Sequence, residues 1–345
     1  MKDYKRILIV EVNWLGDVLF STPLVKAIRK KYKNAYIACM VVPRCRQILE
    51  YSPYIDEIIT YDEKKTHRSL FGKIRLIAIL RRRDFDLAIL LHRSFTRALI
   101  AMLAGIRERI GYITEKGHRM LTRPIEPPES PVHKVEYFLK LAESLGCDIS
   151  NKDYDFFISD RERDHINKEL SLAGIEKEDL LVVVNPGGNW RSKRWSEDNF
   201  AKLCKALFEK FNIKIVISGA KKDVELASRI KEKAGPDISV FAGKTDLKEL
   251  GALMGRANFV ISADSGPMHI AVSMGSNVIA LFGPTSPELT GPYGNGNYRV
   301  IRKNTECETP CYDVTCNDHR CMDSITVEDV LETFEEMYCA QMGKK

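Results

Sequence analysis

Residues 259–271 combine a strand, a tight turn and a helix start that carries reactive side chains. The apolar run 259–261 predicts a buried strand. Pro267 then opens a helical run, because the N–H that proline lacks would have no partner in a first helical turn. The residues at the junction are Asp264, Ser265, Gly266 and His269. Free N–H groups and the helix dipole favour anions, so the segment predicts a phosphate site, with helix capping by the acid and the hydroxyl as the alternative.

A second turn, residues 186–189, follows the apolar run 180–184 and precedes a cluster of basic residues. The ammonium of Lys193 can neutralise a phosphate as a point charge, and Arg191 and Arg194 could do the same. The alternative interpretation leaves these basic side chains in solvent. The two turns together predict an anion site in the second half of the chain.

An acid occupies the corresponding place in the first half. Asp17 ends a turn, residues 13–17, after the apolar run 6–12, and residues 21–23 then open an amphipathic helix. A carboxylate there can act as a general base, with helix capping as the alternative. Several arginines further along are spread in a way that suits an anionic acceptor: Arg93, Arg97, Arg107, Arg109, Arg119 and Arg123.

Ligands of open α/β sheets bind beyond the carboxyl ends of the strands. The residues expected at those ends are Asn13, Gly16, Asp17, His92, Arg93 and Ser94 in the first half. In the second half they are Gly187, Gly188, Asn189, Gly219, Asp264, Ser265, Gly266 and Thr285. This set suits a nucleotide-linked substrate with a diphosphate. Neither G-x-G-x-x-G nor G-x-x-x-x-G-K-[ST] occurs, which argues against a dinucleotide dehydrogenase and a P-loop NTPase.

Alternating strand and helix patterns predict an α/β fold. The pattern breaks at the proline-rich residues 124–131 and restarts at residue 180. We therefore expect two Rossmann-like, doubly wound domains facing a cleft, with boundaries at 1–160 and 178–325. Residues 326–342 predict an amphipathic final helix, with Thr326 as its N-cap.

Charge is unevenly distributed over the 345 residues. Residues 1–150 contain 27 Lys and Arg against 17 Asp and Glu, a balance of +10, whereas residues 151–345 have a balance of −4. The first half is therefore suited to an anionic surface or ligand, such as a lipid headgroup or a nucleic acid, or it is simply a solvated basic surface. No nucleic-acid-binding motif supports the second option. No apolar run of about 18 residues and no signal peptide occur, so we expect a cytoplasmic protein.

Four cysteines, Cys307, Cys311, Cys316 and Cys321, lie close together in the sequence, with His319 among them. Zinc sites usually show closer pairs, such as C-x2-C, so we expect structural thiols, with a metal or iron–sulfur site as the alternative.

Several segments, taken in order along the chain, resemble one family. Asn13-Trp-Leu-Gly-Asp-Val-Leu-Phe-Ser-Thr-Pro23 resembles the opening motif of the family 9 glycosyltransferases, the lipopolysaccharide heptosyltransferases. Pro186-Gly-Gly-Asn-Trp-Arg-Ser-Lys-Arg-Trp195 resembles their second motif, and Asp264-Ser-Gly-Pro-Met-His269 their donor motif. Residues 282–294 and His319-Arg-Cys-Met322 are most similar to the heptosyltransferase II branch. The resemblance runs nearly from end to end.

This resemblance implies the GT-B fold, with ADP-heptose bound by the C-terminal domain and a Kdo-lipid A core acceptor bound by the N-terminal domain. It implies a final segment, 326–345, that packs back on the N-terminal domain. The reaction is a single displacement that inverts the anomeric carbon. Helix N–H groups and a lysine can stabilise the departing diphosphate, so no metal is expected to be obligatory and a divalent cation would be at most stimulatory. We expect a peripheral protein on the inner face of the inner membrane, with no nucleic-acid partner.

The resemblance also implies roles for individual residues. Asp17 is the catalytic base. The donor-binding residues are Gly188, Asn189, Lys193, Asp223, Asp264, Ser265, Gly266 and His269, where the match at Asp223 is loose because the family more often has Glu. The residues expected to bind the acceptor are Asn13, Arg93, Arg97 and Arg123. Other members of the family, of heptosyltransferase I or III type, and a non-catalytic sugar-nucleotide-binding protein are the alternatives.

Overall fold

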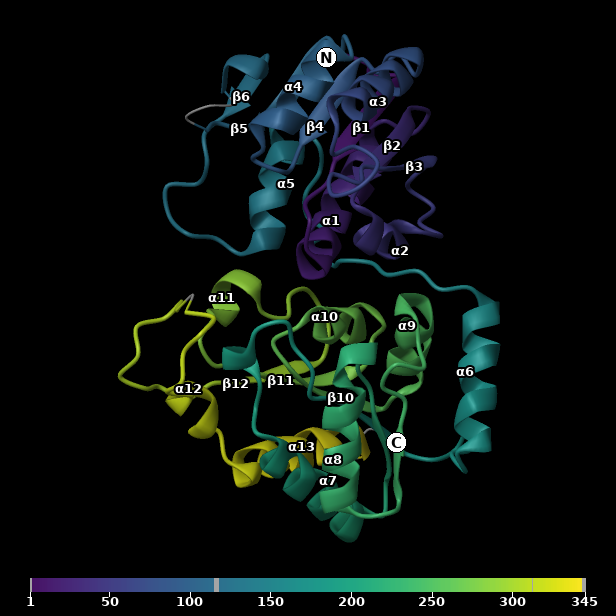
Figure 1. Ribbon diagram of the computed structural model, residues 1–345, viewed down its shortest axis with the longest axis vertical. Coiled ribbons are helices and arrows are strands. Elements are labelled where there is room, and N and C mark those ends of the chain that lie inside the picture. The colour runs from purple at the N-terminus through teal and green to yellow at the C-terminus, as the bar shows by residue number, and fades with distance from the viewer. Residues whose placement is uncertain (1, 115–117, 312, 343–345) are drawn as a thin grey trace. The chain divides into compact units, whose positions relative to one another are not determined.

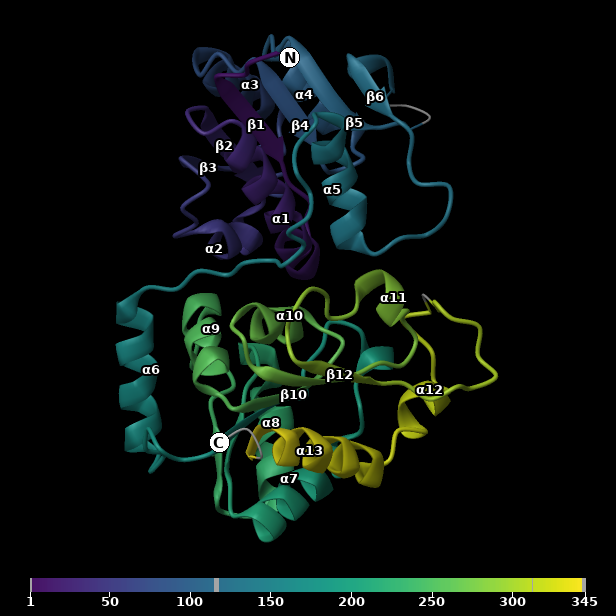
Figure 2. The ribbon, with the colours of Figure 1, turned by 180° about the vertical axis from the view of Figure 1, so that it is seen from behind.

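The apolar runs form two six-stranded parallel sheets, one in each of two units of the chain (Figures 1 and 2). The structure is a computed structural model that describes residues 2–114, 118–311 and 313–342. The first unit is Met1–Phe157 and the second is Ile158–Lys345.

The first unit has the sheet order β3-β2-β1-β4-β5-β6. Its strands are β1 (Arg6–Val10), β2 (Tyr36–Val41), β3 (Glu57–Thr60), β4 (Leu87–Leu90), β5 (Glu108–Tyr112) and β6 (Arg123–Ile125). Its helices are α1 (Leu15–Lys31), α2 (Arg46–Leu49), α3 (Leu70–Arg82), α4 (Phe95–Leu103) and α5 (Lys134–Ser144). Helix α1 packs with α5 and α3 packs with α4. Strand β1 is apolar and buried after Arg6 because helices bury both faces of the sheet, as in most parallel sheets.

The second unit has the sheet order β12-β11-β10-β7-β8-β9. Its strands are β7 (Leu181–Asn185), β8 (Lys214–Ile217), β9 (Ile238–Val240), β10 (Phe259–Ala263), β11 (Asn277–Leu281) and β12 (Tyr298–Ile301). Its helices are α6 (Asp160–Leu172), α7 (Glu197–Phe211), α8 (Val224–Ala234), α9 (Leu247–Arg256), α10 (Gly266–Ser273), α11 (Pro287–Thr290), α12 (Arg320–Asp323) and α13 (Val327–Met342). The predicted α/β fold with two doubly wound units is therefore confirmed.

Both sheets have the strand order of a dinucleotide-binding fold, in which the chain reverses direction across the sheet after the third strand. The reversal leaves a crevice between β1 and β4 in the first unit and between β7 and β10 in the second. Ligands of this fold bind at that switch point. The predicted turns after β1, β4, β7 and β10 therefore lie where such a fold binds its ligands.

Helix α1 begins six residues earlier than the sequence pattern predicts. It starts at Leu15, so Asp17 lies in its first turn and Pro23 lies inside the helix. Proline cannot donate to the carbonyl four residues back. The hydroxyl of Thr22 donates to that carbonyl, Leu19 O, at 2.8 Å. The side chain thus replaces the missing backbone donor, which is why the helix passes through the proline.

The final helix, α13, packs within the second unit, and the expected packing of residues 326–345 on the first domain stays a prediction. Val330 and Phe334 are fully buried in the same hydrophobic cluster as Phe259 of β10. The contacts of α13 include α7, β11 and β12. Residues 343–345 of the expected range lie outside the described residues.

The boundary between the units also differs slightly from the expected one. It falls after Phe157 rather than after residue 160. Helix α6, which falls between the two expected domain ranges, belongs to the second unit because it packs against α9.

Candidate functional site

The carboxylate of Asp264 organises the end of β10 and the start of α10. It is 7% exposed, and its Oδ2 accepts hydrogen bonds from Lys193 Nζ and Thr285 Oγ1, both at 2.6 Å. The Lys193 ammonium also lies 4.5 Å from the centre of the Trp190 ring. An ion pair and an aromatic ring thus hold the ammonium beside the N-terminus of α10. The two predicted turns are therefore brought together by direct contact.

A cluster of small polar side chains lies beside this pair. Asn185 Nδ2 donates to Ser262 Oγ and Ser265 Oγ, each at 3.3 Å, while Asn185 Oδ1 accepts from Ser218 Oγ at 3.2 Å. Ser265 is the N-cap residue of α10, but its side chain makes no capping hydrogen bond. The structure therefore does not support the alternative of simple capping by this hydroxyl. Asn185, Ser218 and Ser262 were not predicted as site residues. Asn185 ends β7, Ser218 follows β8 and Ser262 is the next-to-last residue of β10, so a polar residue at the end of an apolar run is the signal that marks them.

Asp223 is buried against two glycines at the ends of β7 and β8. A Cβ atom on Gly187 would lie 2.8 Å from Asp223 Oδ2, and one on Gly219 would lie 3.0 Å from Asp223 Cβ. Any larger residue in place of Gly187 or Gly219 would therefore displace the Asp223 side chain. Asp223 Oδ2 accepts from Ala220 N at 3.1 Å. Asp223 Oδ1 has no hydrogen-bond partner in the described part of the chain, and Arg194 Nη2 lies 3.7 Å from it.

The remaining predicted donor residues lie around these two acids. Arg194 Nη2 donates to Gly188 O at 2.7 Å, and Lys222 Nζ donates to the exposed Asn189 at its Oδ1, at 2.9 Å. Gly266 and His269 lie in the first two turns of α10, where His269 is 3% exposed. All eight predicted donor residues thus follow β7, β8 or β10, at the edge of the second sheet where the parallel strands end.

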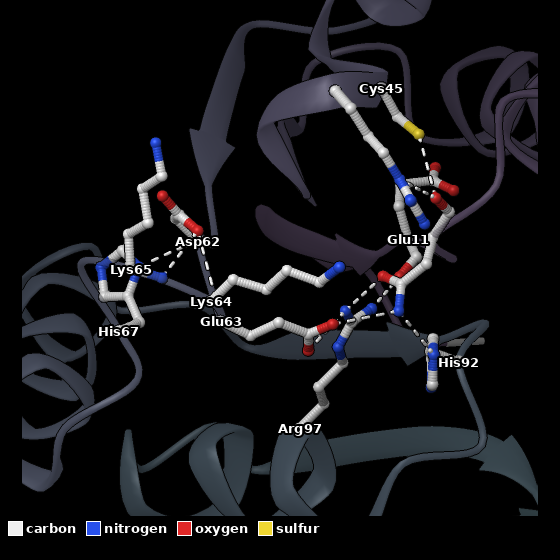
Figure 3. A network of polar contacts seen from close by, with 11 residues as sticks. Glu11, Cys45, Asp62, Glu63, Lys64, Lys65, His67, His92 and Arg97 are labelled. Atoms are coloured by element: carbon white, nitrogen blue, oxygen red, sulfur yellow. Dashed lines mark hydrogen bonds and ion pairs between the residues drawn. The ribbon is translucent and has the colours of Figure 1, made fainter.

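In the first unit, a partly buried network holds the side chain of Asn13. Figure 3 shows three of its members, Glu63, His92 and Arg97. Asn13 Oδ1 accepts from Arg97 Nη2 at 2.5 Å, and Asn13 Nδ2 lies 3.3 Å from both Glu63 Oε1 and His92 Nε2. Because Asn13 Nδ2 is a donor, His92 Nε2 must accept, and the proton of the neutral ring resides on Nδ1. Burial and the nearby Arg97 guanidinium lower the pKa of His92 to about 4, which keeps the ring neutral.

Arg97 is an internal residue of this network, so its predicted direct contact with an acceptor does not fit its position. It is 2% exposed, and its guanidinium donates to Glu11 O, Asn13 Oδ1 and Glu63 Oε2. Figure 3 shows the guanidinium of Arg97 directed toward Glu11 and Glu63. The sequence position of Arg97, in the first turn of the helix that follows β4, is indistinguishable from that of a ligand-binding arginine, and only packing reveals the difference.

The two other predicted acceptor arginines lie far apart in the first sheet. Arg93 is exposed and lines an open hollow of about 270 Å³ together with His92, Ser94 and Tyr112. Arg123 opens β6 and donates to Ser144 O at the end of α5. The charge of Arg123 favours a lower pKa at Tyr4, which precedes β1, and at Glu108, which is the first residue of β5. The Arg123 side chain therefore lies toward the end of the sheet opposite Asn13. Arg123 does not contact the network around Asn13 in the described residues, and its acceptor-binding role stays a prediction.

Asp17 lies in the first turn of α1 and is half-buried. The neighbouring Trp14 is the N-cap residue of this helix, is 56% exposed, and has the Arg44 guanidinium 4.5 Å from its ring centre. Trp14 and Glu63 were not predicted as site residues. An aromatic side chain next to an acid in a turn is the signal that marks Trp14, whereas nothing in the sequence separates Glu63 from other surface acids.

Glu11 behind this network is fully buried, and burial raises the pKa of its carboxyl from 4.5 to about 7. Ser21 Oγ donates to its Oε2 at 2.9 Å. Between pH 4.5 and 7 the folded protein therefore retains a proton that the unfolded chain has released. The free energy of unfolding must consequently fall by about 3 kcal/mol in total as the pH rises from 4.5 to 7. Above pH 7 it stays constant.

We expect Glu11→Gln to remove this pH dependence, because the amide cannot ionise. Urea unfolding of the two proteins at a series of pH values from 5 to 8 measures the difference. Glu129→Gln, at an exposed acid of the same unit, is the control and should keep the wild-type slope. Equal slopes for wild type and Glu11→Gln would show that this carboxyl does not titrate in the window.

The cysteine cluster has no metal-binding arrangement in the described part of the chain. Cys307, Cys311 and Cys316 are half-buried and Cys321 is buried, and all four are free thiols. No three His, Cys, Asp or Glu side chains among residues 2–114, 118–311 and 313–342 meet in a geometry that could hold an ion.

The comparisons with known proteins point to one family. The model of glycosyltransferase family 9 (heptosyltransferase) matches residues 73–321. Lipopolysaccharide heptosyltransferase 2 of Salmonella typhimurium is 28% identical, over 96% of this chain and 98% of its own length. A solved family 9 glycosyltransferase from Veillonella parvula has a TM-score of 0.90 at 27% identity, covering 97% of this chain and 98% of its own. ADP-heptose LPS heptosyltransferase II of E. coli has a TM-score of 0.81 at 26% identity, covering 98% and 99%.

Proposed function

The chain belongs to glycosyltransferase family 9, the heptosyltransferases, and from this premise we propose that it transfers heptose from ADP-heptose to the inner core of lipopolysaccharide. The acceptor is heptosyl-Kdo2-lipid A, as for a heptosyltransferase of type II. The observation that carries the proposal is the Lys193–Asp264 ion pair at the N-terminus of α10, beside the switch point of the second sheet. This arrangement offers a cation and helix N–H groups to a diphosphate.

In the proposed reaction, an acceptor oxygen attacks the anomeric carbon of the heptose while the bond from that carbon to the ADP oxygen breaks. The configuration at the carbon inverts. Negative charge grows on the departing diphosphate in an oxocarbenium-like transition state. Lys193 and the N–H groups at the start of α10 stabilise that charge as it develops, and Ser265 and His269 complete the diphosphate site. Asp264 keeps the ammonium in place.

Asp17 accepts the proton of the attacking hydroxyl. Its position in the first turn of α1, after β1, supports this role because the same edge of the sheet carries Asn13 and His92. The Nδ1–H of neutral His92 is a donor without a partner in the described residues, and Arg93 is exposed beside it. These two side chains bind the anionic acceptor. Arg97 acts indirectly, by fixing the orientation of Asn13.

Asp223 binds the ribose hydroxyls of the donor, since its Oδ1 is a buried acceptor that lacks a hydrogen bond. We expect Asp223→Asn to weaken ADP-heptose binding roughly 10- to 100-fold with little change in kcat, because a hydrogen bond to a charged group is worth ~1.5–3 kcal/mol. Calorimetric titration with ADP and a steady-state donor series measure the two effects. Asp237→Asn, at an exposed acid, is the control. Unchanged donor affinity in a folded Asp223→Asn protein would remove Asp223 from the site.

The donor site as proposed requires no cofactor. Lysine and helix N–H groups supply the positive charge that a metal would otherwise provide, so a divalent cation is at most stimulatory. Turnover in the presence of a chelator tests this point.

The acceptor is a lipid, and we therefore propose that the protein acts in the cytoplasm, as a peripheral protein on the inner face of the inner membrane. No helix in the described ranges is both long and apolar enough to cross a bilayer. The balance of +10 in residues 1–150 favours an anionic surface over a nucleic acid, for which no motif is present.

A coupled assay for ADP release, with ADP-heptose and a heptose-primed inner core acceptor, tests the function. Turnover that depends on both substrates supports it. Turnover with another sugar nucleotide, or with an acceptor that lacks the first heptose, would assign the protein to another type of enzyme within family 9. Binding of ADP-heptose without ADP release under all acceptors would indicate a non-catalytic binding protein.

A further inference from the structure

The outward face of α3 is apolar where a surface helix is normally polar. Leu70 is 72% exposed, Phe71 is 86% exposed and Ile74 is 52% exposed. The same helix buries Leu76 and Leu80 against the first unit. Large apolar side chains gathered on a surface mark a site where something else binds.

Basic residues surround these three apolar side chains. They are Lys64, Lys65 and Arg68 before the helix and Arg75 and Arg82 within it, all exposed. None of the five forms an ion pair with any residue that the structure describes. Helical spacing puts Phe71, Ile74, Arg75 and Arg82 on one face of α3. We call these eight residues, the five basic and the three apolar ones, the α3 patch.

Local packing holds the loop that carries Lys64, Lys65 and Arg68 against the first turn of α3. Asp62 N donates to His67 Nδ1 at 3.0 Å, and His67 N donates to Asp62 O at 2.8 Å. Gly72 lies so close to this loop that a Cβ atom there would be 2.1 Å from Thr66 O. Ser69 Oγ caps the helix by accepting from Gly72 N. Lys64 and Lys65 are therefore kept near Leu70 and Phe71 by the fold.

The same loop reaches the candidate acceptor residues. Glu63 directly precedes Lys64, and its carboxylate contacts Asn13 Nδ2 and Arg97 Nη2, each at 3.3 Å (Figure 3). Whatever binds the α3 patch is thus held next to the residues that the proposed function assigns to the acceptor.

We propose that the α3 patch docks the protein on an anionic phospholipid bilayer. Leu70, Phe71 and Ile74 enter the boundary between headgroups and acyl chains, and the basic side chains contact lipid phosphates. An apolar face bordered by Lys and Arg is the pattern of an interfacial helix. The proposal deepens the proposed function, since it identifies the surface that brings the enzyme to its lipid-borne acceptor.

Charge complementarity favours this occupant over a second copy of the chain. A twofold dimer through the α3 patch would place two identical basic clusters against each other, and their repulsion would oppose association. Anionic headgroups instead neutralise the five cations, each of which should strengthen partitioning roughly fivefold.

Co-sedimentation with vesicles tests the proposal on the full chain. Wild type should bind vesicles of phosphatidylethanolamine with phosphatidylglycerol and should bind phosphatidylcholine vesicles far less. We expect Phe71→Glu to lose roughly tenfold or more in partitioning, and Arg68→Gln to lose roughly fivefold. The matched controls are Leu172→Glu, at a 74% exposed leucine of α6, and Lys202→Gln, at an exposed lysine of α7, and both should bind as wild type does. Equal binding by Phe71→Glu and wild type would overturn the proposal, as would a wild-type dimer that Phe71→Glu converts to a monomer.

Two acceptors separate this proposal from the proposed function. With a water-soluble, delipidated core oligosaccharide, Phe71→Glu should turn over as wild type does, because the patch is outside the reaction site. With the acceptor embedded in anionic vesicles, Phe71→Glu should be slower. An equal rate on embedded acceptor would overturn the docking role. Absence of ADP release from wild type with either acceptor would refute the proposed function while leaving the vesicle-binding result valid.

Discussion

Asp17→Asn is expected to lower kcat by roughly 10²–10⁴-fold, the usual contribution of a general base. Asparagine keeps the shape of the side chain in the first turn of α1 but cannot accept the proton of the attacking hydroxyl. The affinity for ADP-heptose should stay unchanged, because the donor residues all belong to the second unit. Rates of ADP release at saturating substrates and calorimetric titration with ADP measure the two quantities.

Asp84→Asn is the matched control for this substitution. Asp84 is an exposed acid of the same unit with a left-handed backbone at φ 46°, a conformation that asparagine adopts as readily as aspartate. It should turn over like wild type. If Asp17→Asn also showed near-normal turnover, another group would have to be the base.

Lys193→Gln is expected to lower kcat by roughly 10²–10³-fold, the effect of removing one donor that stabilises developing negative charge. The reason is the position of the ammonium, held by Asp264 and Trp190 beside the start of α10. Lys193→Arg keeps the charge and should recover part of the rate, although its planar group cannot reproduce the point-charge geometry. Steady-state kinetics of the three proteins give the comparison.

Two further measurements separate a chemical effect from a structural one. Lys205→Gln removes an exposed lysine that pairs with Glu209 on α7, and it should leave kcat unchanged. Thermal unfolding of Lys193→Gln reports any loss of fold from leaving Asp264 without its partner. A raised donor KM with an unchanged kcat would mean that Lys193 binds the ground state and transition state equally, which contradicts the proposed role.

Strands with long apolar runs were predicted well from the sequence. The run 259–261 lies inside β10, the run 180–184 agrees with β7 to within one residue at each end, and the run 6–12 contains β1. The short or polar strands β5, β6, β9 and β12 were not predicted. β9 and β6 have only three residues each, and β12 is largely exposed, so their pairing with neighbouring strands defines them and no local pattern does.

The approach of Lys193 to Asp264 could be anticipated because two properties coincide in the sequence, whereas their donor-binding role stays a prediction. Asp264 and Lys193 each follow an apolar strand, and parallel strands end at one edge of a sheet. Their approach to within 2.6 Å follows from that topology. The partners Asn185, Ser218 and Thr285 come from three further places in the chain, and only the sheet order brings them together.

From the sequence alone, the fold class, the family resemblance and the segments that carry chemistry could be determined, since apolar periodicity and turn residues are local properties. Only the tertiary structure decided the role of each arginine and of the last helix. Arg97 and Arg123 have the same charge, but packing buries the first beneath Asn13 and places the second at the other end of the sheet. The apolar stripe of α13 fits more than one surface, and α7 with β11 is the surface it covers. Such choices depend on which surfaces meet, and a linear pattern does not contain that information.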